Sequence, residues 1–442
     1  MLIHWFFALS FVQCIVRSQA KSDSLLTVFL LARHGERYPC HDFKHLFYPE
    51  EYSNLRCQLT ENGAQQHYKL GQFIRERYSN LFISEGFKQE EIHIRSTGTE
   101  RTILSGTYFG LGLNSNSTSG LPHVPPVFSS PKRYDSLLKM SYPCPAFSEL
   151  FKASLDSNLS REFSQSELKL FEELKNFTDF EYEPTSPHMA LKELWKLCEP
   201  IYVWDGLERS TKGDSLPFSP ELAESCHRAL SFRQQLRFSG PSQTFLRGGP
   251  LWDHVLSTMR RLSASAMDDD DFLADPEEID ILDIPIPPET RFLAYFAHDS
   301  TVAAFLSHAG MFNNILPPYA CAVIVELHRM TDGQLGLKFF YHNSTEPSSV
   351  NLVTLSSPLC TDERTGWCRL DILEEKLRDR AATDMETACA KRDESSNRFK
   401  LAITTLIISF AFAYILPIGF TVRALLCLIS ILLTYRALFF LS

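Results

Sequence analysis

Near its start the chain reads Leu25-Leu26-Thr27-Val28-Phe29-Leu30-Leu31-Ala32, followed directly by Arg33-His34-Gly35-Glu36-Arg37-Tyr38-Pro39. The first of these stretches is an almost continuous apolar run, which predicts a buried strand. Charged side chains are costly to bury without partners, so packing does not explain two arginines around a histidine at the strand's end. Their presence is explained if the end of the strand presents Arg33, His34 and Arg37 to an anion.

Two later segments also place charged residues directly after an apolar strand. Residues 91–94 lead into Arg95-Ser96-Thr97-Gly98-Thr99-Glu100-Arg101-Thr102, and residues 292–296 lead into Ala297-His298-Asp299-Ser300-Thr301. Each has an ordinary structural alternative. Arg101 is equally typical of a surface residue in the first turn of a helix, and Asp299 of a helix cap.

These residue types match what phosphoryl transfer from an ester needs: an anion site, a nucleophile and a proton donor. Guanidinium groups make paired contacts with phosphate oxygens, so Arg33 and Arg37 are candidates for phosphate binding. His34 is the candidate nucleophile, since surrounding cations lower the pKa of its imidazole and keep it neutral; an ordinary turn histidine is the alternative. His298 can donate to a phosphate oxygen, and Asp299 can protonate the leaving alcohol.

The segment at 33–39 resembles the Arg-His-Gly-x-Arg-x-Pro signature of the histidine acid phosphatases. The segment at 95–102 resembles that family's Arg-Ser-Thr-Asp-x-x-Arg-Thr motif, which implies that Arg101 joins the phosphate site. Gly98 stands where the family has an acid, so the hydrogen bonds of that acid are missing. The resemblance runs from about residue 24 to residue 389 and is greatest to the lysosomal and prostatic members.

The resemblance implies an α/β sheet with a helical cap and a reaction that passes through a phosphohistidine. It also implies that no metal or other cofactor is needed and that homodimers are common. The cysteine positions of the family imply the disulfides Cys144–Cys389, Cys198–Cys321 and Cys360–Cys368. A Cys40–Cys57 disulfide is suggested separately by the closeness of both residues to the active loop, and Cys226 is left without a partner.

The patterning of the chain predicts an α/β fold with a central, mostly parallel sheet flanked by helices. Predicted strands cover residues 25–32, 91–94, 292–297, 322–327 and 337–341, and a helix over 64–79 follows Thr60, a candidate cap. Residues 115–239 read as an inserted, mainly helical cap over the end of the sheet. A solvated helical subdomain without a role in chemistry is the alternative. The acidic segment 267–283 is typical of a solvated loop more than of a calcium site.

Both ends of the chain carry apolar segments. Residues 1–20 are predicted to be a signal peptide cleaved near Ala20, which leaves a phosphatase domain over 21–395. Residues 401–442 are predicted to form a transmembrane tail, with the number of crossings left open. Acceptor sequons for glycosylation begin at Asn116, Asn158, Asn176 and Asn343. These features place the protein in the secretory pathway, at a lysosomal or cell-surface membrane, with its catalytic domain lumenal or extracellular.

The chain has 442 residues and a net charge of -10, which argues against nucleic acid as a partner. A local basic site on an acidic protein still suits a small phosphate monoester. The expected function is therefore that of an acid phosphatase. A phytase-like enzyme acting on inositol phosphates ranks second, because the cap is not notably basic in sequence. A catalytically inert surface glycoprotein on the same scaffold is the remaining alternative, disfavoured because the nucleophile and the proton donor are both present.

Overall fold

The structure is a computed structural model that describes residues 23–40, 54–81, 89–115, 124–175, 187–211, 218–265, 285–344, 352–360 and 366–390. The predicted signal peptide, the acidic segment at 267–283 and the predicted membrane tail at 401–442 lie outside these residues. Within the described ranges, no helix combines the length and the apolar character that a membrane span requires.

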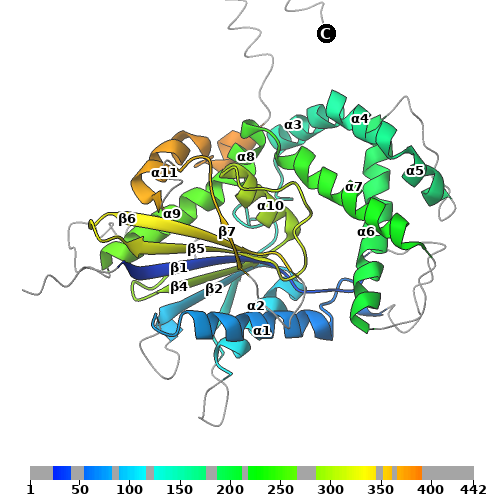
Figure 1. Cartoon of the computed structure of the whole chain (residues 1–442). Coiled ribbons are helices and arrows are strands. Elements are labelled where there is room, and N and C mark those ends of the chain that lie inside the picture. The colour runs from blue at the N-terminus through cyan, green and yellow to red at the C-terminus, as the bar shows by residue number, and fades with distance from the viewer. Residues whose placement is uncertain are drawn as a thin grey trace, which may run out of the picture. The chain divides into compact units, whose positions relative to one another are not determined.

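A central sheet organises the fold, and eight of its strands lie in the described residues. Their order is β3-β2-β4-β1-β5-β6-β7, with β8 also paired to β6 (Figure 1). The strands are β1 Ser24–Arg33, β2 Ile92–Thr97, β3 Val127–Ser130, β4 Phe292–Ala297, β5 Ala322–Arg329, β6 Leu335–His342, β7 Leu352–Leu355 and β8 Cys368–Arg369.

The sheet is mixed, which corrects the prediction of a mostly parallel one. Strands β3, β2, β4 and β1 pair in parallel, whereas β5 pairs antiparallel to β1 and the pairings of β6 are all antiparallel. The reason is the connection between strands. Helices link the parallel strands, but β5 and β6 are joined by a tight turn in which Met330 and Gln334 pair, and a turn of that length allows only antiparallel neighbours.

The burial of β1 explains its uninterrupted apolar sequence. Phe29 and Leu31 lie in the core cluster on one face of the sheet, and Val28, Leu30 and Ala32 lie in the cluster on the other. Successive side chains of a strand point to opposite faces, so a strand covered on both sides must be apolar throughout. The one polar side chain inside the run is Thr27, which is also buried, and the charged residues follow at the end of the strand.

Helices cover both faces of this sheet (Figure 1). On one face α1 and α2 pack against each other; α1 begins after Thr60, whose hydroxyl accepts from the Gly63 amide as the predicted cap. The opposite face is covered by α9, α10 and α11. The bounds of these helices are α1 Glu61–Arg77, α2 Glu100–Leu113, α9 Gly249–Ser265, α10 Asp299–His308 and α11 Leu370–Leu377.

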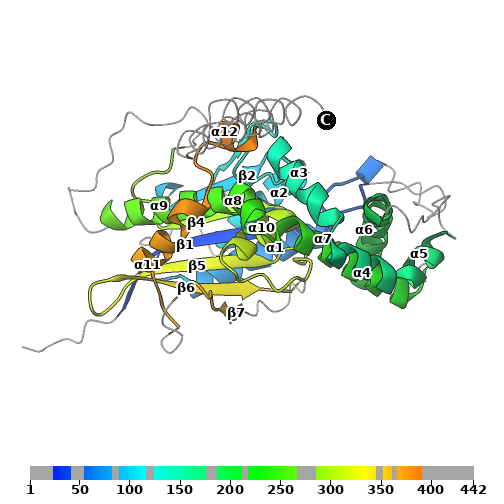
Figure 2. The same ribbon diagram turned by 90° about the horizontal axis from the view of Figure 1, so that it is seen from above.

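The remaining long helices form a cap, defined here as α3 to α7, which lies beside one end of the strands (Figure 2). It has a core of its own, centred on α6 and α7. The helical part starts at residue 145 rather than 115, because residues 127–130 form the sheet's edge strand β3. The bounds are α3 Pro145–Leu155, α4 Asn158–Ser166, α5 Leu168–Leu174, α6 Pro187–Thr211 and α7 Pro220–Phe238; α8 Pro241–Arg247, α12 Met385–Cys389 and the 3-10 turns Gln89–Glu91 and Arg378–Arg380 complete the described helices.

Two of the predicted disulfides are present, and a third is replaced by a different pair that also gives Cys226 a partner. Cys40–Cys57 and Cys360–Cys368 are present, and Cys144 and Cys389 are each disulfide-bonded. The predicted Cys198–Cys321 pair is wrong: Cys198 is bonded to Cys226. Cys198 on α6 and Cys226 on α7 face each other in the cap core with Cα atoms 4.7 Å apart, within the range of a disulfide. Cys321 lies in the core of the sheet as a free thiol.

Candidate active site

The three charged segments come together because the strands they follow are neighbours. Strand β4 lies between β1 and β2 and is parallel to both, with Arg33 opposite Ala297 and Ser96 opposite Phe296. The carboxyl ends of these strands therefore lie at one edge of the sheet, where α/β folds commonly bind ligands. Arg33, His34 and Arg37, the helix start that carries Arg101, and the pair His298 and Asp299 all follow these strand ends.

The His34 ring is held in one orientation by two hydrogen bonds. Its Nδ1 lies 2.8 Å from the Gly35 carbonyl oxygen, and its Nε2 lies 3.0 Å from Arg101 Nε. A carbonyl oxygen only accepts and a guanidinium only donates, so Nδ1 carries the proton and Nε2 offers its lone pair. The ring is thus a neutral imidazole whose Nε2 faces the cationic part of the site.

The surroundings of His34 keep it neutral. Burial lowers the pKa of His34 well below its usual value of 6.5, and the charges of Arg101, Arg33 and Arg37 lower it further. An imidazole in this setting stays unprotonated in mild acid. The expectation that nearby cations preserve the nucleophilic form is therefore supported by the geometry, with burial as the larger cause.

Arg33 and Arg37 are both buried, and each meets a residue of the cap. Arg33 donates to Tyr202 Oη at 3.3 Å and lies over the Tyr319 ring, with its guanidinium carbon 4.1 Å from the ring centre. Arg37 pairs with Glu199. Since Glu199 and Tyr202 belong to α6, the cap contacts the arginines of the site.

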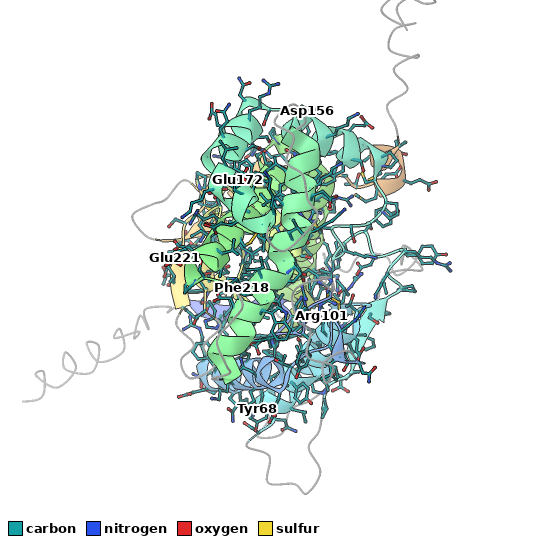
Figure 3. The ribbon with its side chains drawn as sticks, turned by 90° about the vertical axis from the view of Figure 1, so that its right-hand side faces the viewer. Tyr68, Arg101, Asp156, Glu172, Phe218 and Glu221 are labelled. Atoms are coloured by element: carbon teal, nitrogen blue, oxygen red, sulfur yellow. A yellow bond between two sulfur atoms is a disulfide. The ribbon has the colours of Figure 1, made fainter. Side chains whose placement is uncertain are left out.

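Arg101 and His298 both lie close to His34. Arg101, in the first turn of α2, is seen between the cap and the α1–α2 layer in Figure 3. Burial and then the charge of Arg37 lower the pKa of Arg101 to about 10, so it stays charged in mild acid. The His298 ring centre is 5.5 Å from that of His34, and its Nε2 lies 3.1 Å from Thr97 Oγ1. Burial and Arg101 lower the pKa of His298 to about 3.

Asp299 begins α10, and its side chain is 31% exposed. Its Oδ2 lies 3.6 Å from Arg33 Nη2, and its Oδ1 accepts from the Ser300 amide. Burial raises the pKa of Asp299, but Arg33, His298 and Arg233 together outweigh that effect and lower it. The N-cap of α10 is His298, so the helix-cap reading of Asp299 is wrong: Asp299 is the first residue of the helix, with one carboxyl oxygen on the Ser300 amide and the other near Arg33.

The loop after His34 is held by the start of α1. A Cβ atom on Gly35 would lie 2.3 Å from the Gly63 carbonyl oxygen, and a Cβ on Gly63 would lie 2.2 Å from the Glu36 carbonyl oxygen. Both contacts are with backbone, so neither position accepts a side chain. The Glu36 carboxylate accepts from Thr60 Oγ1 at 2.9 Å and from Asn62 Nδ2 at 3.0 Å. The close approach that requires Gly35 is therefore to helix α1.

Four further residues of the site were not foreseen from the sequence: Thr97, Glu199, Tyr202 and Tyr319. Thr97 falls inside the segment 95–102 already described for its motif, so its position gave a signal. Glu199 and Tyr202 lie in an ordinary amphipathic helix more than 160 residues from their partners, at sequence separations of 162 and 169. No local pattern marks such a contact.

The unusual residue Gly98 has a packing explanation. A Cβ atom at this position would lie 2.8 Å from the carbonyl oxygen of Ser130, at the end of edge strand β3. The chain between β2 and α2 passes too close to β3 for a side chain. The acid that the family carries at this position is therefore excluded here by backbone, and Arg101 is held without it.

We expect Gly98→Ala and Gly98→Asp each to lower the free energy of unfolding by about 1–3 kcal/mol, because the added atoms must displace backbone. Denaturation in urea would measure this. Gly206→Ala is the matched control: nothing lies within 4 Å of a Cβ at this position inside α6, so its stability should be unchanged or slightly raised. Unaltered stability of both Gly98 variants would show that the β2–β3 contact is looser than described.

Residues 24–346 match the histidine phosphatase superfamily (branch 2). The chain belongs to this family. The match covers the segments that carry His34, Arg101 and Asp299, and it confirms the family indicated by the motifs.

The similarity of this histidine phosphatase extends over most of its length. It is 29% identical to prostatic acid phosphatase of Bos taurus, covering 84% of this chain and 89% of the relative. It is 24% identical to human lysosomal acid phosphatase, covering 76% of this chain and 74% of the relative. Among solved structures, a Hafnia alvei phytase in complex with tartrate shares the fold with a TM-score of 0.63 at 17% identity, covering 83% of this chain and 98% of the phytase.

Proposed function

We propose that this histidine phosphatase hydrolyses phosphate monoesters through a phosphohistidine formed on His34 Nε2. The observation that carries the proposal is the orientation of the His34 ring. Nδ1–H is held by the Gly35 carbonyl, and Nε2 presents a lone pair toward Arg101 among buried cations. This is the arrangement that in-line attack on a bound phosphate requires.

In the proposed reaction, Arg33, Arg37 and Arg101 hold the phosphate oxygens, with His298 as a further donor. Arg101 exchanges its bond with His34 for the phosphate, which frees Nε2 to attack phosphorus. The P–N bond forms as the ester P–O bond breaks, and Asp299 gives its proton to the departing oxygen. Water then attacks the phosphohistidine, with the Asp299 carboxylate taking a proton, and inorganic phosphate leaves.

The proposal gives a clear pH dependence for alkyl esters. The pKa of Asp299 is below its usual value before substrate binds, so its protonated fraction falls about tenfold for each pH unit above that pKa. His34 stays neutral through the same range. We therefore expect kcat/KM for glycerol 2-phosphate to be greatest in acid and to fall toward neutral pH, measured on the purified full-length protein with EDTA present. Activity that is lost with EDTA, or that rises toward neutral pH, would contradict this mechanism.

Two alternatives are distinguished by the same assay. Preference for inositol hexakisphosphate over glycerol 2-phosphate would favour a phytase-like enzyme; the similarity to phytase structures concerns the fold alone. A folded protein without turnover would favour an inert surface glycoprotein. The presence of both His34 and Asp299 in the site disfavours the inert glycoprotein, and the phytase-like enzyme ranks second because the cap is not notably basic in sequence.

We also propose that the domain works in the secretory pathway. Its disulfides suit an oxidising compartment, and its relatives include proteins named prostatic and lysosomal acid phosphatases. Asn158 and Asn343 are exposed, as glycan acceptors must be, while Asn116 and Asn176 lie outside the described residues. Anchoring by residues 401–442, and the homodimer that the resemblance implies, are further parts of the proposal.

A further inference from the structure

Helix α7 carries two arginines that the proposed mechanism does not use. Arg233 and Arg237 are one helical turn apart on the same side of the helix and are partly buried. Among the described residues neither forms an ion pair with a carboxylate, and the buried Nε of Arg233 has no hydrogen-bond partner. Arg228 on the same helix is different: it is exposed and pairs with Glu167 and Glu224.

Both arginines lie beside the candidate active site. Helix α7 packs against α10, which begins with Asp299, and against α6, which carries Glu199. The guanidinium carbon of Arg233 is 5.7 Å from the centre of the Trp195 ring, and Trp195 lies one turn before Glu199 on α6. Arg233 is thus placed at the junction of the cap with the catalytic edge of the sheet.

Arg237 is tied to the first turn of α10 through one short loop. It donates to the Met140 carbonyl oxygen at 3.4 Å. Two residues earlier, the Leu138 carbonyl oxygen accepts from Thr301 Oγ1 at 2.8 Å. Since Thr301 lies two residues after Asp299, Arg237 and Arg233 lie along the side of the site where Asp299 is located.

The carboxylates nearest these two cations form their ion pairs with other arginines. Asp299 is paired with Arg33 and Glu199 with Arg37, and their charges act on Arg233 only from beyond ion-pair distance. Burial lowers the pKa of Arg233, and burial with the charge of Arg233 lowers the pKa of Arg237 to about 9. Both remain charged in acid. Partly buried cations without a carboxylate in contact are costly, and a bound anion would reduce that cost.

We propose that Arg233 and Arg237 form a second anion subsite that binds the leaving-alcohol part of the substrate. The inference rests on the proposed function, because Asp299 then marks the side from which the alcohol departs. Groups next to Asp299 meet the alcohol, whereas Arg33, Arg37 and Arg101 meet the transferred phosphate. The preferred substrates are phosphate monoesters whose alcohol carries another anionic group, a carboxylate or a second phosphate.

A series of phosphonates tests this without any turnover, because their C–P bond is not an ester. Phosphonoacetate, 3-phosphonopropanoate and 4-phosphonobutanoate place a carboxylate at increasing distance, and methyl-, ethyl- and propylphosphonate are the matched compounds without it. We expect at least one carboxylate compound to bind the full-length protein about tenfold more tightly than its match, by calorimetry in mild acid. If no carboxylate improves binding, the second subsite does not exist.

Variants show which residues cause the tighter binding of the carboxylate compounds. Arg233→Gln and Arg237→Gln should each reduce the affinity ratio between matched compounds about fivefold to tenfold, while Arg233→Lys should keep part of it. Arg228→Gln, from the exposed side of the same helix, should keep the full ratio. If the affinity ratio persists in both glutamine variants, the carboxylate binds to the phosphate-site arginines instead. That result would overturn the assignment of the second subsite to Arg233 and Arg237.

The outcomes also separate this inference from the proposed function. If propylphosphonate binds but a carboxylate adds nothing, the phosphate site stands and the second subsite is refuted. If none of the phosphonates binds, the phosphate site itself is refuted and the second subsite with it. Should the glutamine variants fail to fold because Arg233 only packs on Trp195, the comparison of compounds on the unaltered protein still decides the question.

Discussion

Replacing His34 by alanine should reduce kcat for 4-nitrophenyl phosphate by about 10⁴-fold or more, with folding retained. The reason is geometric. His34 Nε2 is a neutral nitrogen that faces the phosphate arginines, and the described site offers no second side chain in an equivalent position. Because the ring is buried between strand ends, circular dichroism and urea denaturation should accompany the kinetic measurement.

His328→Ala is a suitable control for this experiment. His328 lies on β5 opposite Leu25, at the end of the sheet away from the site, where it meets Glu326. Its loss should leave kcat unchanged within a factor of about two. Alkaline quenching during turnover should also trap phosphate on the unaltered protein and on the His328 variant but not on His34→Ala. Turnover by His34→Ala at more than a tenth of the normal rate would refute the assignment of His34 as the nucleophile.

The parallel half of the fold could be predicted from sequence because it is buried on both faces. Strand β4 was predicted with the observed bounds, and β1 with an error of one residue at each end. The short edge strand β3 was missed: two of its four residues are exposed, so it shows neither a continuous apolar run nor clear alternation. Strands β5 and β6 were predicted, but their antiparallel direction was not, because apolar content predicts a strand without giving its direction.

The candidate site was predictable where its residues follow strands and unpredictable where they come from the cap. All six predicted residues, Arg33, His34, Arg37, Arg101, His298 and Asp299, come together at one edge of the sheet. The pairing of Arg37 with Glu199 depends on how the cap folds back, which no local pattern records. The wrong partner for Cys198 has the same origin: it requires knowing that α6 and α7 pack together.

The charge of the cap shows why composition is a poor guide to specificity. In sequence the cap is not notably basic, and this observation ranked a phytase-like substrate second. In the structure Glu224 is exposed and pairs with Arg228, and Glu199 pairs with Arg37, whereas Arg233 and Arg237 are partly buried and form no ion pair among the described residues. Recognition of an anion depends on which charges are unpaired beside the ligand, and an average over the cap conceals them.

Replacing Asp299 by asparagine should separate two classes of substrate. We expect kcat for glycerol 2-phosphate to fall by about 10²–10⁴-fold, because its alkoxide leaves only with a proton. For 4-nitrophenyl phosphate the fall should be less than about tenfold, since 4-nitrophenolate is a stable anion. Asparagine keeps the shape and the contact with the Ser300 amide, so α10 should still begin in the same place. The ratio of the two losses is the measurement that isolates proton donation.

The control for this ratio is the other carboxylate of the site. Glu199→Gln removes a negative charge beside Arg37, just as Asp299→Asn removes one beside Arg33. A general change in the charge of the phosphate site should change kcat for both substrates by the same factor. We expect this result for Glu199→Gln. If Asp299→Asn also lowers kcat for both substrates by the same factor, the carboxyl group acts only through its charge beside Arg33, and the leaving group takes its proton from water. A large effect on glycerol 2-phosphate alone would assign the proton to Asp299, because no change in phosphate binding depends on the leaving alcohol.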